Sequence, residues 1–247
     1  MDAINAPSES NPKVSSIEMN MQYVALATDG DGTLLEDGRM LPQTIAALEQ
    51  LRANDVSLLL VTGETFEELR EFPRLDLFRR VVAENGSLLL IPSTNEQTLL
   101  GVRPPCELIA ALRNADVKKL KVGQGMISAK TSEEPKLRDV LARIKVDWKI
   151  IHNRRDVMLL PGEIDKASGL AAALNDLQIP RQHVVAVGDA ENDAVMLQYA
   201  GLGAAVADAV SFLKERADVV LSGGAGAGVV ELAQSILRGD LPSPKVH

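Results

Sequence analysis

The sequence predicts an α/β fold in which a doubly wound parallel sheet, of the Rossmann-like kind, carries a smaller inserted α/β domain. Short apolar runs that end at a polar residue or a glycine alternate with stretches of helical period, which is typical of buried parallel strands joined by helices. The alternation stops near residue 92 and resumes near residue 157, so an insertion interrupts one sheet. A chain of 247 residues is long enough for this architecture.

The first half of the sheet is predicted between residues 21 and 92. Apolar runs indicate strands at 23–28, 56–62, 81–83 and 87–91, and helices are expected at 42–53 and 65–71. Because strand-helix-strand units recur, we expect right-handed parallel connections.

The second half of the sheet is predicted between residues 157 and 247. Strands are expected at 184–187, 204–206 and 219–221, and helices at 167–176, 194–200, 211–216 and 228–237. Residues 223–228 are rich in glycine, but they lack the Lys-Ser/Thr ending of a P-loop and the glycine spacing of a dinucleotide site. They indicate a flexible connector.

Residues 93–156 are predicted to form the inserted cap domain. Helices are expected at 105–114 and 135–144, and strands at 119–130, 147–151 and 156–160. An insertion of roughly 60 residues suits a lid better than an independent domain. Residues 1–20 are rich in Ser, Asn and Pro and have no apolar core, so we expect them to be a disordered tail.

The composition argues against several classes of protein. Lys and Arg number 26 and Asp and Glu number 34, a net charge of −8 without a basic tract, so binding to nucleic acid or to an anionic membrane is not expected. No run approaches the roughly 18 apolar residues of a membrane span. Cys106 is the only cysteine, which excludes an internal disulfide and favours a cytoplasmic protein.

Asp29 and Asp31 carry most of the functional information. They follow the first predicted strand, and ligands bind at the carboxyl edge of open α/β sheets. Two carboxylates this close repel each other unless a cation or a shared proton relieves the repulsion. The pair therefore indicates a metal site or an acid/base site.

Three simpler interpretations compete with this one. Two consecutive Asp-Gly dipeptides at 29–32 are typical of hairpin turns. A calcium loop that starts at Asp29 requires Gly at its sixth position and Glu at its twelfth, where the sequence has Leu34 and Met40. A solvated surface loop explains the charges but not the apolar residues on both sides.

Further polar groups follow other predicted strands or begin a helix, namely Thr62-Gly63, Asp189 and Lys166. A parallel sheet brings such residues to one edge. Phosphoryl transfer needs a nucleophile, a proton donor for the leaving oxygen, a cation and donors to the phosphate oxygens. Asp29 can be the nucleophile, Asp31 the acid and Asp189 a further ligand for Mg²⁺.

These motifs resemble those of the haloacid dehalogenase superfamily, and more narrowly its Cof-type phosphatases, whose α/β cap is inserted between the second and third motifs. The matching segments are DGDGT at 29–33, Thr62 after LLLV, Lys166 in IDKASGL and GDAENDAVM at 188–196. Together they extend over nearly the whole chain outside the tail. The resemblance implies a Mg²⁺-dependent phosphatase that hydrolyses a small phosphomonoester, such as a sugar phosphate or a phosphoglycolate-like metabolite, through an aspartyl-phosphate intermediate.

The resemblance also implies a role for each motif residue. Asp29 would be the phosphorylated nucleophile and Asp31 the acid/base, with its main-chain carbonyl on Mg²⁺. Asp189 would complete the protein ligands of the metal, and Asp193 would hold metal-bound water or Lys166. The phosphate would be bound by Thr62, Gly63, Lys166 and Asn192. We expect a monomer or a homodimer.

One position departs from the pattern of this family. Cof-type relatives often continue the Thr-Gly pair with Arg, but this chain has Glu64. Either a cap residue such as Arg154 or Arg155 supplies the positive charge, or the substrate contact differs. We expect Glu64 to point away from the phosphate or to meet a basic substrate group. The cap residues expected to select the substrate are Gln124, Met126, Lys149, His152, Arg154 and Arg155.

Two other functions fit the same motifs. A phosphosugar mutase of the same superfamily would use the same aspartate pair but would return the phosphoryl group to its substrate. A non-catalytic regulatory protein would be expected to have lost catalytic residues, whereas every motif residue is present.

Overall fold

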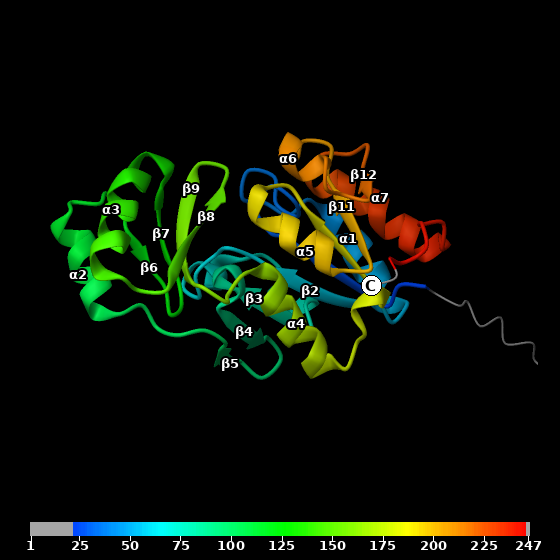
Figure 1. Ribbon diagram of the computed structural model, residues 1–247. Coiled ribbons are helices and arrows are strands. Elements are labelled where there is room, and N and C mark those ends of the chain that lie inside the picture. Colours follow the sequence, from blue (N-terminus) through cyan, green and yellow to red (C-terminus); the bar gives the residue numbers. More distant parts are fainter. Residues whose placement is uncertain (1–21, 246–247) are drawn as a thin grey trace, which may run out of the picture.

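The computed structural model describes residues 22–245, so the tail expected over residues 1–20 lies outside the described residues. Two sheets, one of eight strands and one of four, form two α/β bodies that lie side by side (Figure 1). Within the described residues, no helix has the length and apolar character needed to cross a membrane.

The larger sheet has the strand order β12-β11-β10-β1-β2-β3-β4-β5. Its parallel strands are β1 (Ala25–Thr28), β2 (Ser57–Val61), β3 (Arg80–Ala83), β10 (Val184–Gly188), β11 (Leu202–Ala205) and β12 (Val219–Val220). Two antiparallel strands, β4 (Leu88–Ile91) and β5 (Glu96–Leu99), extend one edge. The predicted doubly wound α/β fold is thus confirmed.

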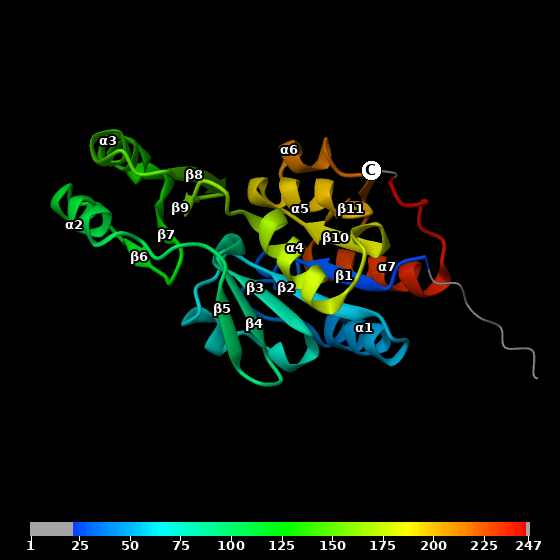
Figure 2. The ribbon, with the colours of Figure 1, turned by 60° about the horizontal axis from the view of Figure 1, so that its bottom comes forward.

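Helices cover both faces of this sheet (Figure 2). On one face α1 (Pro42–Ala53) packs against α7 (Ala225–Arg238), and on the other α4 (Lys166–Leu177) packs against α5 (Ala194–Tyr199). The short α6 (Ser211–Lys214) and the 3₁₀ turns η1 (Glu68–Glu71), η2 (Leu75–Leu77), η3 (Glu84–Gly86), η5 (Arg181–His183) and η6 (Glu191–Asp193) complete the body. All side chains of the central strands β1, β2 and β10 are buried, and each buried Leu or Val contributes about 1.5–3 kcal/mol.

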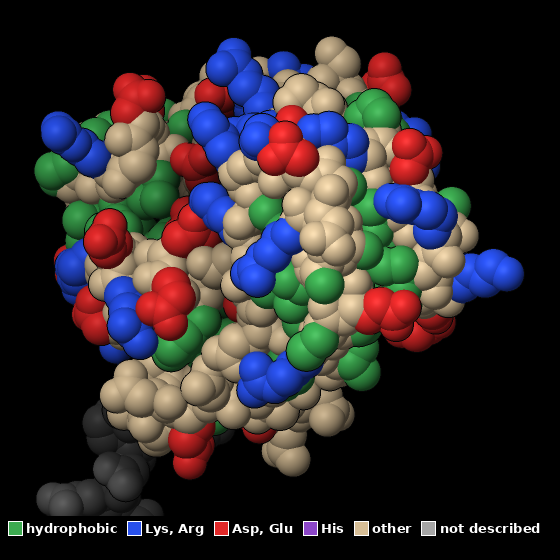
Figure 3. Space-filling view, turned by 90° about the vertical axis from the view of Figure 1, so that its left-hand side faces the viewer, with side chains coloured by type: hydrophobic (Ala, Val, Ile, Leu, Met, Phe, Trp, Pro, Cys, Tyr) green, Lys and Arg blue, Asp and Glu red, His purple; other side chains and the backbone are tan. Residues whose placement is uncertain are grey.

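The smaller sheet is antiparallel, with the order β6-β7-β9-β8. Its strands are β6 (Lys121–Val122), β7 (Ile127–Lys130), β8 (Trp148–Asn153) and β9 (Asp156–Pro161), and a 3₁₀ turn, η4 (Thr131–Glu133), follows β7. The helices α2 (Cys106–Asn114) and α3 (Glu134–Ile144) lie on the side away from the larger sheet (Figures 1 and 2). On that outer side of the molecule, acidic and basic side chains are interspersed (Figure 3).

Strand alternation gives the smaller sheet one apolar and one polar face. Ile127 and Ala129 of β7 and Val157 and Leu159 of β9 are buried in a cluster that includes side chains of α2 and α3. The residues between them point the other way, toward the larger body.

The element boundaries differ from the sequence prediction at two edges of the cap. β5 lies inside the range expected for the cap, yet it pairs with β4 in the larger sheet. β9 runs to Pro161 and pairs throughout with the smaller sheet. We therefore propose that the cap extends from about residue 101 to about residue 161, instead of 93–156, and that the flanking residues belong to the core.

Three local expectations were wrong. The segment 119–130 is a hairpin of β6 and β7, not one strand, and of the helix expected at 65–71 only the 3₁₀ turn η1 forms. The glycine-rich segment is not a free connector, because α7 begins at Ala225. Gly226 is the place where α7 approaches α1: a Cβ there would lie 2.5 Å from the Thr44 hydroxyl.

Candidate active site

Three predicted site residues meet at the carboxyl edge of the larger sheet. Asp29 follows β1, Thr62 follows β2 and Asp189 follows β10, and β1 lies between the other two strands. The Asp29 amide donates to the Val187 carbonyl at 3.0 Å, which continues the β1–β10 ladder into the loop. Both neighbours of β1 are parallel to it, so the hairpin interpretation of the Asp-Gly pairs is excluded.

Lys166 reaches this edge from the first turn of α4. Asp165 caps that helix: its carboxylate accepts the Ser168 amide at 2.9 Å, and its own amide donates to the Ser168 hydroxyl at 3.0 Å. The cap fixes where the helix begins and therefore where Lys166 emerges. Only 1% of Lys166 is exposed, and its ammonium group contacts the carboxylate of Asp29 and lies 2.7 Å from that of Asp193.

Asp193 is held from three directions. One carboxylate oxygen accepts the amides of Asp189 and Ala190 at 2.9 and 3.0 Å, and the other accepts Lys166. Gly188 leaves room for this side chain, since a Cβ there would lie 2.5 Å from it. Asp193 thus positions both Lys166 and the loop that carries Asp189.

Three buried carboxylates form a group that suits a cation. Single oxygens of Asp29, Asp189 and Asp193 lie within 4.8 Å of one another. Burial raises the pKa of Asp29 well above its ordinary value; Lys166 opposes this rise, whereas Asp193 and Asp189 add to it. Burial by itself would lower the pKa of Lys166, but Asp193 and Asp29 raise it, so this lysine is charged. One ammonium beside three carboxylates leaves negative charge that a divalent cation would neutralise, and oxygen ligands are those that Mg²⁺ prefers.

Asp31 lies outside that carboxylate group. Its side chain is exposed and lines the cavity next to Asp29, where it can meet a leaving group. Gly32 has a φ of +80°, and a Cβ at this position would lie 2.5 Å from an oxygen of Asp189. The Asp-Gly repeat is therefore what allows the first loop to fold against the Asp189 loop.

Arg154 of the cap contacts the carboxylate group directly. Its Nε and Nη2 atoms both lie 2.5 Å from Asp189 Oδ2, and its amide donates to the Glu191 carboxylate at 2.9 Å. The positive charge of this cap arginine thus lies on a carboxylate of the candidate metal group.

Of the residues other than Lys166 that are expected to bind phosphate, Thr62 and Gly63 line the same cavity as Asp29, whereas Asn192 does not line it. Thr62 is buried, and its hydroxyl accepts the Glu64 amide at 3.2 Å. Gly63 lines the cavity, and a Cβ there would lie 2.8 Å from Met158 of the cap. Nδ2 of the Asn192 side chain donates to Oδ1 of the Asn85 side chain at 2.9 Å, so Asn85 is a neighbour that the sequence did not reveal.

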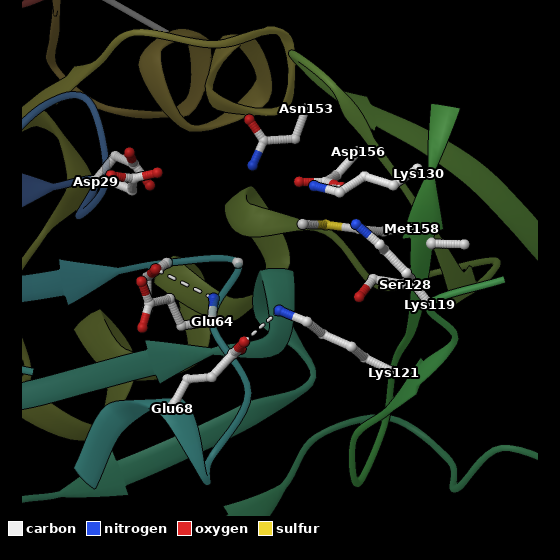
Figure 4. A pocket seen from close by; sticks show the side chains of 14 residues that line it. Asp29, Glu64, Glu68, Lys119, Lys121, Ser128, Lys130, Asn153, Asp156 and Met158 are labelled. Atoms are coloured by element: carbon white, nitrogen blue, oxygen red, sulfur yellow. Dashed lines mark hydrogen bonds and ion pairs between the residues drawn. The ribbon is translucent and has the colours of Figure 1, made fainter. Parts of the chain in front are cut away.

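A cavity of about 300 Å³ lies between Asp29 and the polar face of the cap sheet (Figure 4). Its core wall includes Asp29, Asp31, Thr62, Gly63, Glu64 and Glu68, and its cap wall includes Lys119, Lys121, Ser128, Lys130, Asn153, Asp156 and Met158. Glu64 lines this cavity. Burial, together with the nearby Glu68 and Asp31, raises its pKa.

The cap residues expected to select the substrate do not line this cavity. Met126 is buried with Met158, Leu160 and Ile164, Gln124 bonds to Gln97, Lys149 pairs with Asp165, and His152 pairs with Glu134. Arg155 lines a second, neighbouring hollow together with Arg154. Ser128 and Lys130 alternate along β7, and this period of two was the signal available in the sequence. Lys119 lies in the turn before β6, where no such signal exists.

Comparisons with known proteins identify the family of this chain. The profile of the haloacid dehalogenase-like hydrolase family matches residues 26–112 and 111–232. A phosphoglycolate phosphatase of Saccharolobus solfataricus is 28% identical over 91% of this chain and 97% of its own length, and one of Methanopyrus kandleri is 30% identical over 85% and 96%. A haloacid dehalogenase-like hydrolase from Bacteroides thetaiotaomicron superposes with a TM-score of 0.73 at 18% identity over 87% of this chain and 99% of its own, which is a likeness of fold. With its four motifs on one sheet edge and this match along its length, the chain belongs to the haloacid dehalogenase-like hydrolase family.

Proposed function

We propose that this hydrolase is a Mg²⁺-dependent phosphatase that cleaves a small phosphomonoester through a phosphorylated Asp29. The observation that carries the proposal is the placement of Asp29: a buried carboxylate at the centre of the sheet edge, in contact with Lys166, with Asp31 on the same cavity. A nucleophile, a cation and a second carboxylic acid are the parts that phosphoryl transfer through a covalent intermediate requires.

The carboxylates of Asp29 and Asp189 and the main-chain carbonyl of Asp31 would hold the metal ion. Both carboxylate oxygens of Asp193 already accept hydrogen bonds, so we assign Asp193 to metal-bound water and to Lys166. When bound, Mg²⁺ neutralises the phosphate oxygens and keeps Asp29 ionised. Lys166, Thr62, Gly63 and Asn192 would bind the phosphate oxygens.

In the first step a carboxylate oxygen of Asp29 attacks phosphorus, and the bond from phosphorus to the ester oxygen breaks. Asp31 donates a proton to that leaving oxygen, so the alcohol departs neutral. The exposed position of Asp31 on the cavity lets it meet the leaving group without entering the carboxylate group.

In the second step the carboxylate of Asp31 takes a proton from water, and the water oxygen attacks the phosphorus of the aspartyl-phosphate. The bond between phosphorus and Asp29 breaks, which releases inorganic phosphate and restores both carboxyl groups. The cap covers the cavity and limits the access of bulk water during the first step.

Two features support a short substrate. The cavity of about 300 Å³ is at the small end of the range for ligand sites. Relatives that match most of this chain are phosphoglycolate phosphatases. We therefore propose a phosphoglycolate-like ester as the substrate, with a sugar phosphate as the alternative.

A phosphate-release screen over phosphorylated metabolites, with and without Mg²⁺, tests this function. We expect Mg²⁺-dependent release of one phosphate per substrate consumed, and its loss in Asp29→Asn. Asp55→Asn, the same change at an exposed residue just beyond α1, is the matched control and should retain activity. Full activity of Asp29→Asn would sink the mechanism, and an isomeric phosphorylated product without free phosphate would indicate the mutase instead.

A further inference from the structure

We propose that the cap wall of the cavity is a binding site for a carboxylate on the leaving group of the substrate, and that Lys119 and Ser128 are the residues that select it. The inference rests on the proposed phosphatase function and names the class of ester: a phosphomonoester whose alcohol part carries a carboxylate a short distance from the ester oxygen.

The register of the cap sheet gathers polar side chains on one face. Lys121 is opposite Ser128, Ser128 is opposite Met158, and Lys130 is opposite Asp156. Partners opposite one another in a sheet project from the same side. The side chains between them are buried against α2 and α3, so this polar face looks toward Asp29 across the cavity (Figure 4).

Three lysines of the cap line the cavity, Lys121 and Lys130 from the sheet and Lys119 from the turn before β6, and two of them have acidic partners. Lys121 lies 2.5 Å from Glu68, and Lys130 lies 2.7 Å from Asp156. The ammonium group of Lys119 makes no hydrogen bond or ion pair within residues 22–245, although Figure 4 shows it directed into the cavity. It is the cation on this wall whose charge the described residues leave unmatched.

Polar side chains that have no hydrogen-bond partner in the described part of the chain lie on the same wall. The side chains of Ser128 and Asn153 line the cavity, and neither forms a hydrogen bond to another described residue. A carboxylate accepts from an ammonium group and from hydroxyl or amide donors at once, so it matches this set. A neutral sugar hydroxyl would leave the charge of Lys119 unmatched.

The acidic residues of the cavity do not reverse this assignment. Glu68 and Asp156 are engaged by Lys121 and Lys130. Glu64 is half-buried, and burial together with the nearby Glu68 and Asp31 raises its pKa, which disfavours its charged form. The remaining acids, Asp29 and Asp31, lie at the phosphate end. An ester that spans the cavity would therefore place its phosphate at Asp29 and its second anionic group at Lys119.

The ratio of kcat/KM for 2-phosphoglycolate to kcat/KM for ethyl phosphate, which lacks the carboxylate, tests the proposal in the full-length enzyme with Mg²⁺. We expect the native enzyme to prefer 2-phosphoglycolate and Lys119→Met to reduce the ratio about 10- to 100-fold, as loss of a charge-assisted hydrogen bond predicts. The change should appear mainly in KM. Lys119→Arg should retain most of the preference, and Ser128→Ala should lower it by a smaller factor.

Lys118→Met is the matched control. Lys118 precedes Lys119, pairs with Asp116 and does not line the cavity, so its removal should leave the ratio unchanged. Glycerol 3-phosphate, whose alcohol part is polar but uncharged, provides a third substrate that separates carboxylate recognition from general hydrophilicity.

Equal kcat/KM for the two esters in the native enzyme would overturn the proposal. The proposal would also be overturned if Lys119→Met and Lys118→Met each lowered kcat/KM equally for both esters. A native enzyme with a higher kcat/KM for glycerol 3-phosphate than for 2-phosphoglycolate would contradict it as well. If Lys119→Met does not fold, Ser128→Ala still decides, because an unchanged ratio there contradicts the site. Failure of the phosphatase function itself looks different: no ester, including p-nitrophenyl phosphate, would then release phosphate with Mg²⁺.

Discussion

Replacing Arg154 with methionine should strengthen the binding of Mg²⁺ to the substrate-free protein. The guanidinium group of Arg154 lies 2.5 Å from Oδ2 of Asp189, whose carboxylate we assign to the metal. A cation and this guanidinium group therefore compete for one carboxylate. Methionine removes the positive charge and keeps much of the apolar stem of the side chain.

The expected size follows from the exposure of the pair. The Arg154 side chain is 44% exposed, so a water-like dielectric applies, and charges of +1 and +2 about 4 Å apart then repel by about 2 kcal/mol. Arg154 can instead move away, at the cost of its ion pair, which is about 1 kcal/mol at such a surface. Either path gives about 1–2 kcal/mol, or roughly a 5- to 30-fold gain in affinity.

Isothermal titration calorimetry of Mg²⁺ into the native protein, Arg154→Met and Arg155→Met measures this gain. Arg155→Met is the control because it removes the same net charge from the adjacent, exposed residue, which makes no ion pair within the described part of the chain. Equal or weaker binding by Arg154→Met would refute the assignment of Asp189 to the metal. An equal gain in Mg²⁺ affinity in both variants would show that the effect comes from the lower net positive charge and not from the contact of Arg154 with Asp189.

Three further changes test other parts of the structure. Lys166→Met leaves Asp29 and Asp193 buried without their cation and should lower the free energy of unfolding by about 3–5 kcal/mol in urea with EDTA; an unchanged midpoint would contradict the buried ion pairs. Asp165→Ala removes the cap of α4 and should cost about 1 kcal/mol in the same assay, whereas no loss would show that the capping box is dispensable. Folding raises the pKa of Glu64, so the contribution of Glu64 to stability falls as the pH rises above the pKa that this residue has in the unfolded chain. Glu64→Gln should therefore raise the melting temperature at pH 8 but not at pH 4. The same shift at both pH values would exclude ionisation of Glu64 as the cause.

The core and its catalytic edge were largely predictable from the sequence. Asp29, Thr62 and Asp189 each follow an apolar run, and a parallel sheet brings the ends of such runs together whatever their separation in the chain. Lys166 was predictable by its place in a motif, and the structure supplies the physical reason: Asp165 and Ser168 start the helix there. Local pattern and topology sufficed for these residues.

The cap and the contacts across the cavity were not predictable in the same way. Lys149 of β8 lies beside Asp165 of the core and away from the cavity, whereas Lys119, in the turn before β6, lines the cavity. Which lysine meets the cavity therefore depends on how the cap sits on the core. The strand β5 could not be predicted from an apolar run, because it lies at the sheet edge and its side chains are polar and largely exposed. The contact between Arg154 and Asp189 depends on how the cap sits on the core, which short-range pattern does not encode.

Trapping the phosphorylated enzyme tests the central claim most directly. The protein is mixed with 2-phosphoglycolate and Mg²⁺, quenched in acid within one turnover, reduced with borohydride, which converts an acyl phosphate to homoserine, and digested for mass spectrometry. We predict homoserine at position 29, none at position 31, and none in Asp29→Asn. Steady phosphate release with an unmodified Asp29 under these conditions, or modification at Asp31 instead, would contradict the assignment of Asp29 as the nucleophile.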